Sequence, residues 1–213
     1  MRIKWLGHSC FKISSKSGIR IVTDPFDDNL GYRIPSVETD IVTVSHGHYD
    51  HNFVDCLNGD FEVIDKVGDF NVKGIPIRGI HTFHDEEEGA KRGNNIVYTY
   101  TVDDIKICHL GDLGHLLTPS QLGMIGDVDV LLIPVGGVYT IAAEQAAEVI
   151  KQLKPAVVVP MHYKTKALRV NVEPVEAFEQ LMNNVEKPAQ QVVEIKKDEL
   201  DKNNLKVYIL RYE

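Results

Sequence analysis

The sequence lacks the features that mark an extracellular or membrane protein. Its 213 residues contain three cysteines, Cys10, Cys56 and Cys108, in an odd and scattered set without a CxxC pair. Such a set forms no disulfide framework, and the simplest compartment for it is a reducing cytoplasm. The segment that starts at Met1 has no apolar signal core, and no run approaches the roughly 18 apolar residues of a membrane span. We therefore expect a cytoplasmic protein with no membrane partner.

Positive charge is scarce as well. The formal net charge is -8, and no basic cluster is longer than Lys196-Lys197. Nucleic-acid binding depends on Lys and Arg contacts with phosphate, so nucleic acid is disfavoured and a small-molecule substrate is favoured. The sequence also contains no Gly-x-Ser-x-Gly motif and no phosphate-cradling glycine loop, which disfavours serine hydrolases and P-loop proteins. Nothing in the sequence indicates an oligomeric state.

Apolar residues, by contrast, are plentiful. They make up 43% of the chain, enough for one compact domain with a real core. Hydrophobic patterning predicts strands over residues 2–6, 10–14, 19–24, 41–45, 61–66, 70–84, 96–102, 105–110, 128–133, 156–159, 191–195 and 205–210. It predicts helices over residues 119–125, 141–153 and 172–183. With no repeats and no linker, we expect a single domain over residues 1–213. Its expected class is α/β: a four-layer αβ/βα sandwich of two mixed sheets packed face to face, with helices outside.

The most informative segment is Ser45-His46-Gly47-His48-Tyr49-Asp50-His51, which directly follows the apolar run 41–44. Neutral imidazoles and a carboxylate are ligands for divalent transition metals. The chain between these residues is too short for all four to bind one ion tetrahedrally. His46 and His48 can point one way while Asp50 and His51 point another, which suits two ions. Three of the nine histidines fall within six positions, so an incidental polar loop explains the segment poorly.

Polar residues also follow other predicted strands. The strand after Pro76 ends at His81 or His84, the strand 105–110 ends at Asp112, and the strand 156–159 ends at His162. Ligands gather in the crevice beyond the ends of buried strands. One site at these strand ends explains all the polar clusters together.

This pattern resembles the metallo-β-lactamase superfamily. The signature HxHxDH is present as residues 46–51, preceded by Val22-Thr23-Asp24 and followed by Gly111-Asp112 and His162. Three further runs resemble the single-domain branch that includes ascorbate-6-phosphate lactonase-like proteins: Leu6-Gly7-His8-Ser9, Ile133-Pro134-Val135-Gly136-Gly137 and Pro160-Met161-His162-Tyr163.

The resemblance implies the ligand roles. His46, His48 and a mid-chain histidine would hold one metal ion, and Asp50, His51 and His162 would hold the second, with Asp112 bridging both. His84 matches the family's aromatic-His pair best, and His81 is the alternative. Asp24 would orient the ligand loop.

The chemistry that follows is hydrolysis. Two ions that share a water lower its pKa toward ~7 and supply hydroxide at neutral pH. We predict an enzyme, a dinuclear metal-dependent hydrolase whose metal-bridging hydroxide attacks a small ester, lactone or phosphodiester. Zinc is favoured, the same ligands accept Mn, Fe or Ni, and no other cofactor is expected. The predicted catalytic residues are Asp50, Asp112 and His115. The alternatives are a phosphodiesterase or nuclease and a non-hydrolytic di-iron redox protein.

Several polar residues keep more than one interpretation. His8 and His115 contact either the substrate and ligands or only solvent at the surface. His109 is expected to be a packed strand residue. Arg92 and Lys164 are candidate anchors for an acidic substrate, and the acidic run 85–88 is expected to form a solvated rim.

Overall fold

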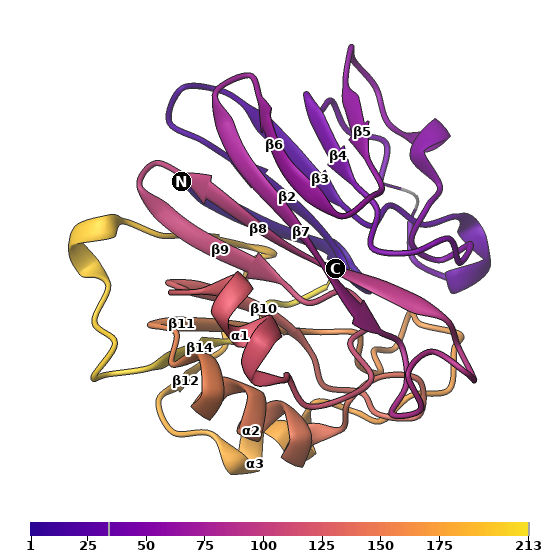
Figure 1. The fold of residues 1–213 in the computed structure, drawn as a ribbon, viewed down its shortest axis with the longest axis vertical. Coiled ribbons are helices and arrows are strands. Elements are labelled where there is room, and N and C mark those ends of the chain that lie inside the picture. Colours follow the sequence, from indigo (N-terminus) through magenta and orange to yellow (C-terminus); the bar gives the residue numbers. More distant parts are fainter. Residues whose placement is uncertain (34, 213) are drawn as a thin grey trace.

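Two mixed β-sheets packed face to face form the protein (Figure 1). The computed structural model describes residues 1–33 and 35–212. The first sheet has the strand order β13-β1-β2-β3-β4-β5, with β1 Arg2–Gly7, β2 Cys10–Ser14, β3 Arg20–Thr23, β4 Ile41–Thr43, β5 Glu62–Ile64 and β13 Val192–Glu194. Its β1, β2 and β3 run antiparallel, whereas β3, β4 and β5 run parallel. The first sheet therefore consists mainly of the N-terminal part of the chain.

The second sheet has the strand order β12-β14-β11-β10-β9-β8-β7-β6. Its strands are β6 Gly68–Val72, β7 Ile75–Phe83, β8 Asn94–Val102, β9 Ile105–His109, β10 Val130–Pro134, β11 Val157–Met161, β12 Val185–Glu186 and β14 Lys206–Tyr208. An antiparallel meander from β6 to β9 continues as a parallel sheet through β10, β11 and β14. The two mixed sheets confirm the predicted sandwich.

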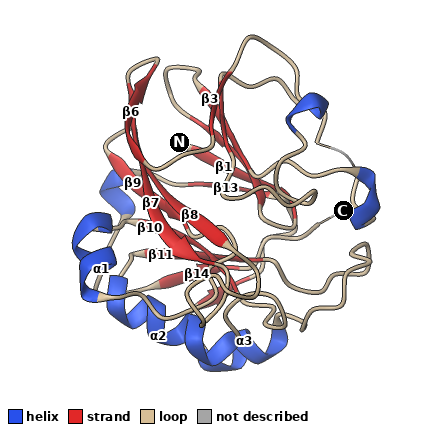
Figure 2. Ribbon diagram, turned by 45° about the vertical axis from the view of Figure 1, so that its right-hand side comes forward, coloured by secondary structure: helices blue, strands red, loops and turns tan. Residues whose placement is uncertain are grey.

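The α-helices of the described chain lie on the second sheet: α1 Pro119–Ile125, α2 Ala143–Leu153 and α3 Glu176–Leu181 (Figure 2). The start of α1 is fixed by Thr118, whose hydroxyl accepts from the Gln121 N–H while the Gln121 side chain reaches back to the Thr118 N–H. The third helix is shorter than the predicted 172–183, because Pro174 precedes it and lies in an isolated bridge with Lys164. No helix in the described residues is long and apolar enough to cross a membrane.

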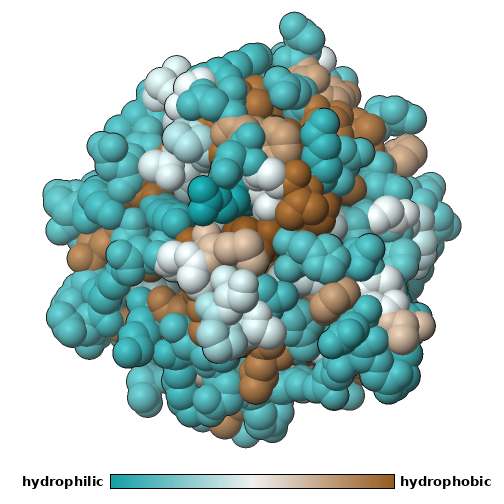
Figure 3. Space-filling model, in the orientation of Figure 1, coloured by the Kyte–Doolittle hydropathy of each residue, from teal (hydrophilic) through white to brown (hydrophobic). Residues whose placement is uncertain are grey.

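The first sheet buries both of its faces. Ile21 and Ile41 belong to the main core, whereas their neighbours Val22 and Val42 belong to a second hydrophobic cluster. That cluster includes Phe26 from the loop after β3. Short 3₁₀ turns at Asp28–Leu30 and Val54–Cys56 lie in the loops of this region. The face in Figure 3 is mostly hydrophilic, with its hydrophobic side chains interrupted by polar ones, as expected when the cores take up most apolar residues.

Two glycines allow the loops at the strand ends to approach each other closely. A Cβ at Gly136 would lie 2.1 Å from the backbone oxygen of His162, and a Cβ at Gly114 would lie 2.2 Å from the backbone nitrogen of Asp85. No side chain fits at either point. The loops after β7, β9, β10 and β11 are therefore packed backbone to backbone, which fixes where their polar side chains point.

Candidate metal centre

Three histidines from two sheets form what we call the outer histidine group: His46, His48 and His84. His46 and His48 come from the loop after β4, and His84 directly follows β7. One ring nitrogen of each lies within 4.8 Å of the others, a spacing suited to a shared metal ion. His84 is buried, His46 is partly buried and His48 is exposed. The group therefore opens toward solvent on one side.

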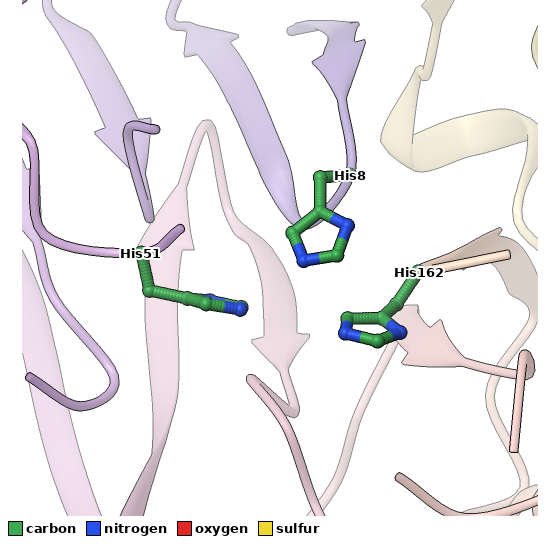
Figure 4. A group of neighbouring side chains, drawn as sticks. All are labelled: His8, His51 and His162. Atoms are coloured by element: carbon green, nitrogen blue, oxygen red, sulfur yellow. The ribbon is translucent and has the colours of Figure 1, made fainter. Parts of the chain in front are cut away.

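Three buried histidines form a second set, the inner histidine group: His8, His51 and His162. His8 lies in the β1–β2 turn, His51 ends the HxHxDH segment and His162 directly follows β11. Figure 4 shows the three rings turned toward a common space. The His8 ring centroid lies 4.1 Å from that of His162 and 5.1 Å from that of His51.

Asp112 joins the two groups. Its Oδ2 atom lies 3.2 Å from Nε2 of His51, 3.3 Å from Nε2 of His84 and 3.2 Å from Nε2 of His162. The carboxylate is buried, and its backbone N–H donates to the Asn95 side chain at 2.9 Å. A single oxygen thus faces both histidine groups, as a bridging ligand would.

Asp50 faces the inner group from the cavity side. Its Oδ2 atom lies 3.4 Å from Nε2 of His8 and 3.9 Å from Nε2 of His51. Its side chain is 16% exposed, so it is reachable from solvent. Burial raises the pKa of Asp50, but its contact with His8 and the nearby His51 outweigh this and hold the pKa well below its usual value.

Asp24 holds the HxHxDH segment from beneath. Its carboxylate accepts hydrogen bonds from the Ser45 N–H at 2.8 Å, the Ser45 hydroxyl at 2.6 Å and Nδ1 of His51 at 2.9 Å. The proton on Nδ1 leaves Nε2 of His51 directed at Asp112. Such a carboxylate–histidine pair fixes the tautomer of a metal-binding imidazole.

Burial and charge set the protonation of the cluster. Burial lowers the pKa of His8 to about 4 and the pKa of His46 to about 3, so both rings are neutral at pH 7. For His51, burial also lowers the pKa, but the neighbouring carboxylates of Asp112 and Asp24 outweigh burial and raise the pKa above its usual value. For Asp112, the neighbouring His162 and His51 overcome burial and hold its pKa well below the usual value.

The donor set fits divalent cations. In the described structure, the Nε2 atoms of His8, His46 and His51 are buried without a hydrogen-bond partner. A buried nitrogen without a partner costs about 1–3 kcal/mol, so these atoms are suited to bind a cation. Imidazoles with carboxylates suit Zn, Fe, Mn or Ni.

The cluster forms the floor of a cavity of about 530 Å³. Its rim carries Lys91, Arg92 and Tyr139. The Arg92 guanidinium lies 5.4 Å from the centre of the Tyr139 ring and donates to the backbone oxygen of Val138. The one wall of this cavity that carries positive charge is therefore partly fixed in place before any substrate binds.

Asp85 shapes this rim, a role that the sequence interpretation missed. The side chain is buried and accepts hydrogen bonds from four backbone N–H groups, those of Glu87, Gly89, Lys91 and Arg92. Burial raises the pKa of Asp85, but these hydrogen bonds outweigh it and lower the pKa to about 2. The expectation of a wholly solvated acidic rim is therefore wrong at its first residue. An aspartate followed by glycine-containing polar residues was the available signal.

The structure brings together the seven residues predicted as metal ligands, His46, His48, Asp50, His51, His84, Asp112 and His162. It brings His84 into the cluster and leaves His81 outside, because His81 is exposed and donates to Asn94. His8 is fully buried, which excludes the surface alternative. The role of these residues in binding metal stays a prediction.

His115 does not reach the cluster. Its Nε2 accepts from the Phe83 N–H and its Nδ1 donates to the backbone oxygen of Leu116, so both nitrogens are occupied. This geometry does not support the predicted catalytic role. Lys164 is similarly occupied by the backbone oxygens of Leu168 and Val170, and does not line the cavity. His109 is buried within β9, as expected for a packed strand residue.

Comparison with known proteins agrees with this architecture. Residues 2–162 match the model of the β-lactamase superfamily domain. A UPF0173 metal-dependent hydrolase of Thermoplasma volcanium is 30% identical over 192 residues, which cover 78% of this chain and 84% of the relative. One from Thermoplasma acidophilum is also 30% identical, with 87% of this chain and 92% of the relative covered. A crystal structure from Thermotoga maritima, assigned to the Zn-dependent hydrolases of the metallo-β-lactamase superfamily, is 42% identical, covers 99% of both chains and superposes with a TM-score of 0.82.

The chain therefore belongs to the β-lactamase superfamily, among the UPF0173 metal-dependent hydrolases. The resemblance carried by HxHxDH and the later strand-end motifs is confirmed. The histidine and aspartate cluster lies in the loops that follow β4, β7, β9 and β11, and its residues could hold a metal ion.

Proposed function

We propose that this protein is a metal-dependent hydrolase with a dinuclear centre that acts on a small ester, lactone or phosphodiester. The observation that carries the proposal is the position of Asp112, whose one oxygen lies 3.2–3.3 Å from imidazoles of both histidine groups. A carboxylate so placed can bridge two cations. We favour zinc, because neutral imidazoles dominate the donor set.

The two groups define the candidate ligands of each cation. The outer histidine group with Asp112 would hold the first, and Asp50, His51, His162 and Asp112 would hold the second. A bound pair of cations would lower the pKa of water and polarise the scissile bond.

The remaining steps belong to side chains of this chain. Asp50 is an ionised carboxylate at the cavity wall, so its Oδ2 can take a proton from the attacking water and pass it to the leaving group. Arg92 and Lys91 lie on the rim, where they can bind an anionic part of the substrate. Asp24 acts through His51 and Ser45 as a positioning residue.

The test begins with elemental analysis of the purified protein, followed by removal of metal with a chelator and stepwise reloading with Zn²⁺. Activity is then measured on a panel of lactones, thioesters and phosphodiesters. We expect about two equivalents per chain, loss of activity with chelator and recovery on reloading. The matched control is His81→Asn, which removes an exposed histidine outside the cluster. A protein that contains no transition metal and cannot be loaded with any contradicts the proposal.

A further inference from the structure

His8 occupies an unusual backbone position. It lies in the β1–β2 turn with φ +52°, a left-handed conformation that glycine adopts far more readily than residues with a side chain. The preceding Gly7 also has a positive φ, at +114°.

The backbone of this turn is tied to both sheets. The backbone oxygen of His8 accepts from the Trp5 indole N–H at 2.9 Å and from the His162 N–H at 3.2 Å. The second bond connects the turn directly to the end of β11. It therefore fixes His8 beside a candidate ligand of the inner cation.

The ring of His8 has no hydrogen-bond partner in the described structure. It is fully buried, and neither Nδ1 nor Nε2 is paired. Buried imidazoles ordinarily donate from one nitrogen and accept at the other. Its Nε2 lies 3.4 Å from Asp50 Oδ2, and one of its nitrogens lies within 4.8 Å of those of His51 and His162. Figure 4 shows the ring pointing between these two side chains.

Two plainer roles explain these facts less well. If His8 only filled space, an apolar side chain would serve better, because burying two ring nitrogens without hydrogen bonds costs free energy. A residue that only oriented Asp50 would need a short hydrogen bond to it, but Nε2 of His8 lies 3.4 Å from Oδ2 of Asp50, which is long for such a bond. That role also leaves unexplained why the nitrogens of His51 and His162 lie within 4.8 Å of the same ring. A cation between His8, His51 and His162 satisfies the nitrogen that faces Asp50.

We propose that His8 is a further ligand of the inner cation, additional to Asp50, His51, His162 and Asp112. The inference rests on the proposed dinuclear function. Five protein ligands exceed the four of a tetrahedral zinc site. The inner position then suits cations that accept five or six ligands, such as Fe²⁺, Mn²⁺ or Co²⁺, whereas the outer position keeps a zinc-like set.

The test uses the His8→Asn variant of the full chain. Asparagine tolerates the positive φ, and its side chain is too short to reach the cation. The metal-free variant and wild type are titrated with Co²⁺, recording the visible absorption bands, and with Zn²⁺ against a competing chelator. His81→Asn serves as the matched control, and thermal unfolding of the metal-free proteins reports folding. If the Asn variant unfolds more readily than wild type, the titrations are repeated with His8→Gly, which adopts this φ without strain.

We expect wild type and His81→Asn to bind two equivalents. His8→Asn should bind the first equivalent with unchanged affinity and the second about 10-fold or more weakly. The bands of its second Co²⁺ should strengthen, because the ion loses a ligand and approaches tetrahedral geometry. A second equivalent bound with wild-type affinity and wild-type bands overturns the role of His8. Wild type that binds fewer than two equivalents overturns the proposed function itself.

Discussion

The two histidine groups differ in burial and in how they are supported. His48 of the outer group is exposed, and the ring of His46 is held by a hydrogen bond with the Ser45 hydroxyl, 2.9 Å from its Nδ1. In the inner group every ring is buried, and Asp24 holds His51. Solvent and substrate can therefore reach the outer position, whereas the inner position depends on the surrounding fold.

The groups also differ in the segments they require. The outer group needs the loop after β4 and the end of β7. The inner group needs the β1–β2 turn, the same loop and the end of β11, two of which are linked by the hydrogen bond from the His162 N–H to His8. Damage to packing should therefore weaken the inner position first.

The largest effect is expected from Asp112→Asn, which removes the carboxylate that both groups share. Three imidazoles lose the charged oxygen that lies within 3.3 Å of each, and the neutral amide in its place is a poor bridging ligand, so both proposed cations should bind far more weakly. We expect activity to fall by about 10³-fold or more, equivalent to about 4 kcal/mol in the barrier. Metal content and turnover are measured beside Asp127→Asn, an exposed control. A variant that keeps one tightly bound equivalent would show that Asp112 serves a single group.

The next largest effect is expected from Gly136→Ala, which should affect the inner histidine group and leave the outer one unchanged. Its new Cβ would clash with the backbone oxygen of His162, so the end of β11 must shift. We expect the free energy of unfolding to fall by about 1–3 kcal/mol, with weaker binding at the inner position and unchanged binding at the outer one.

Thermal unfolding and metal titration check this change, with Gly123→Ala as the matched control. Gly123 lies within α1, and a Cβ there meets nothing within 4 Å, so alanine should stabilise the helix by up to about 1 kcal/mol. Equal loss at both positions would mean that the groups do not differ in their dependence on packing.

A smaller effect is expected from Asp24→Asn. The amide keeps the size of the carboxylate but cannot fix His51 with Nδ1 protonated, so affinity at the inner position should fall about 10–100-fold. Ser45→Ala is the counterpart on the outer side, since it removes the hydroxyl near His46 and that hydroxyl's hydrogen bond to Asp24, but leaves the bond between Asp24 and His51 in place. Competition titrations with Zn²⁺ compare the two variants, and a larger loss for Ser45→Ala would reverse the ranking of the groups.

The smallest effect on metal binding is expected from Asp85→Asn, because Asp85 supports the rim and touches neither group. Metal content should stay unchanged, while KM for anionic substrates rises a few-fold as Arg92 loses its fixed backbone. Because the pKa of Asp85 is lowered to about 2, its support of the loop is complete above about pH 4 and is lost as pH falls toward 2. Amide NMR signals of Lys91 and Arg92 report this transition, which the Asn variant should lack.

Much of this arrangement was predictable from the sequence. The strands were recognised by their apolar runs, and HxHxDH places four candidate ligands next to each other along the chain. Asp112 and His162 were recognised because each follows a strand. These signals are local, so they survive without knowledge of the tertiary structure.

The residues whose roles the sequence did not reveal depend on contacts between distant segments. His8 could be assigned only once the β1–β2 turn was known to lie against the end of β11. His115 was assigned a catalytic role from its closeness to Asp112 in sequence, but the Phe83 N–H occupies its ring. The role of Asp85 depends on a loop conformation that brings four N–H groups around one carboxylate, which composition alone does not reveal.

The bond from the Trp5 indole to the backbone oxygen of His8 has a practical consequence. Trp5 is the single tryptophan of the chain, and its buried ring lies 5.1 Å from that of Tyr163, the residue after His162. Any shift of the turn or of the end of β11 alters the surroundings of this one fluorophore. Its emission therefore reports such shifts without labels and at low protein concentration, and would report cation binding if binding moves either segment.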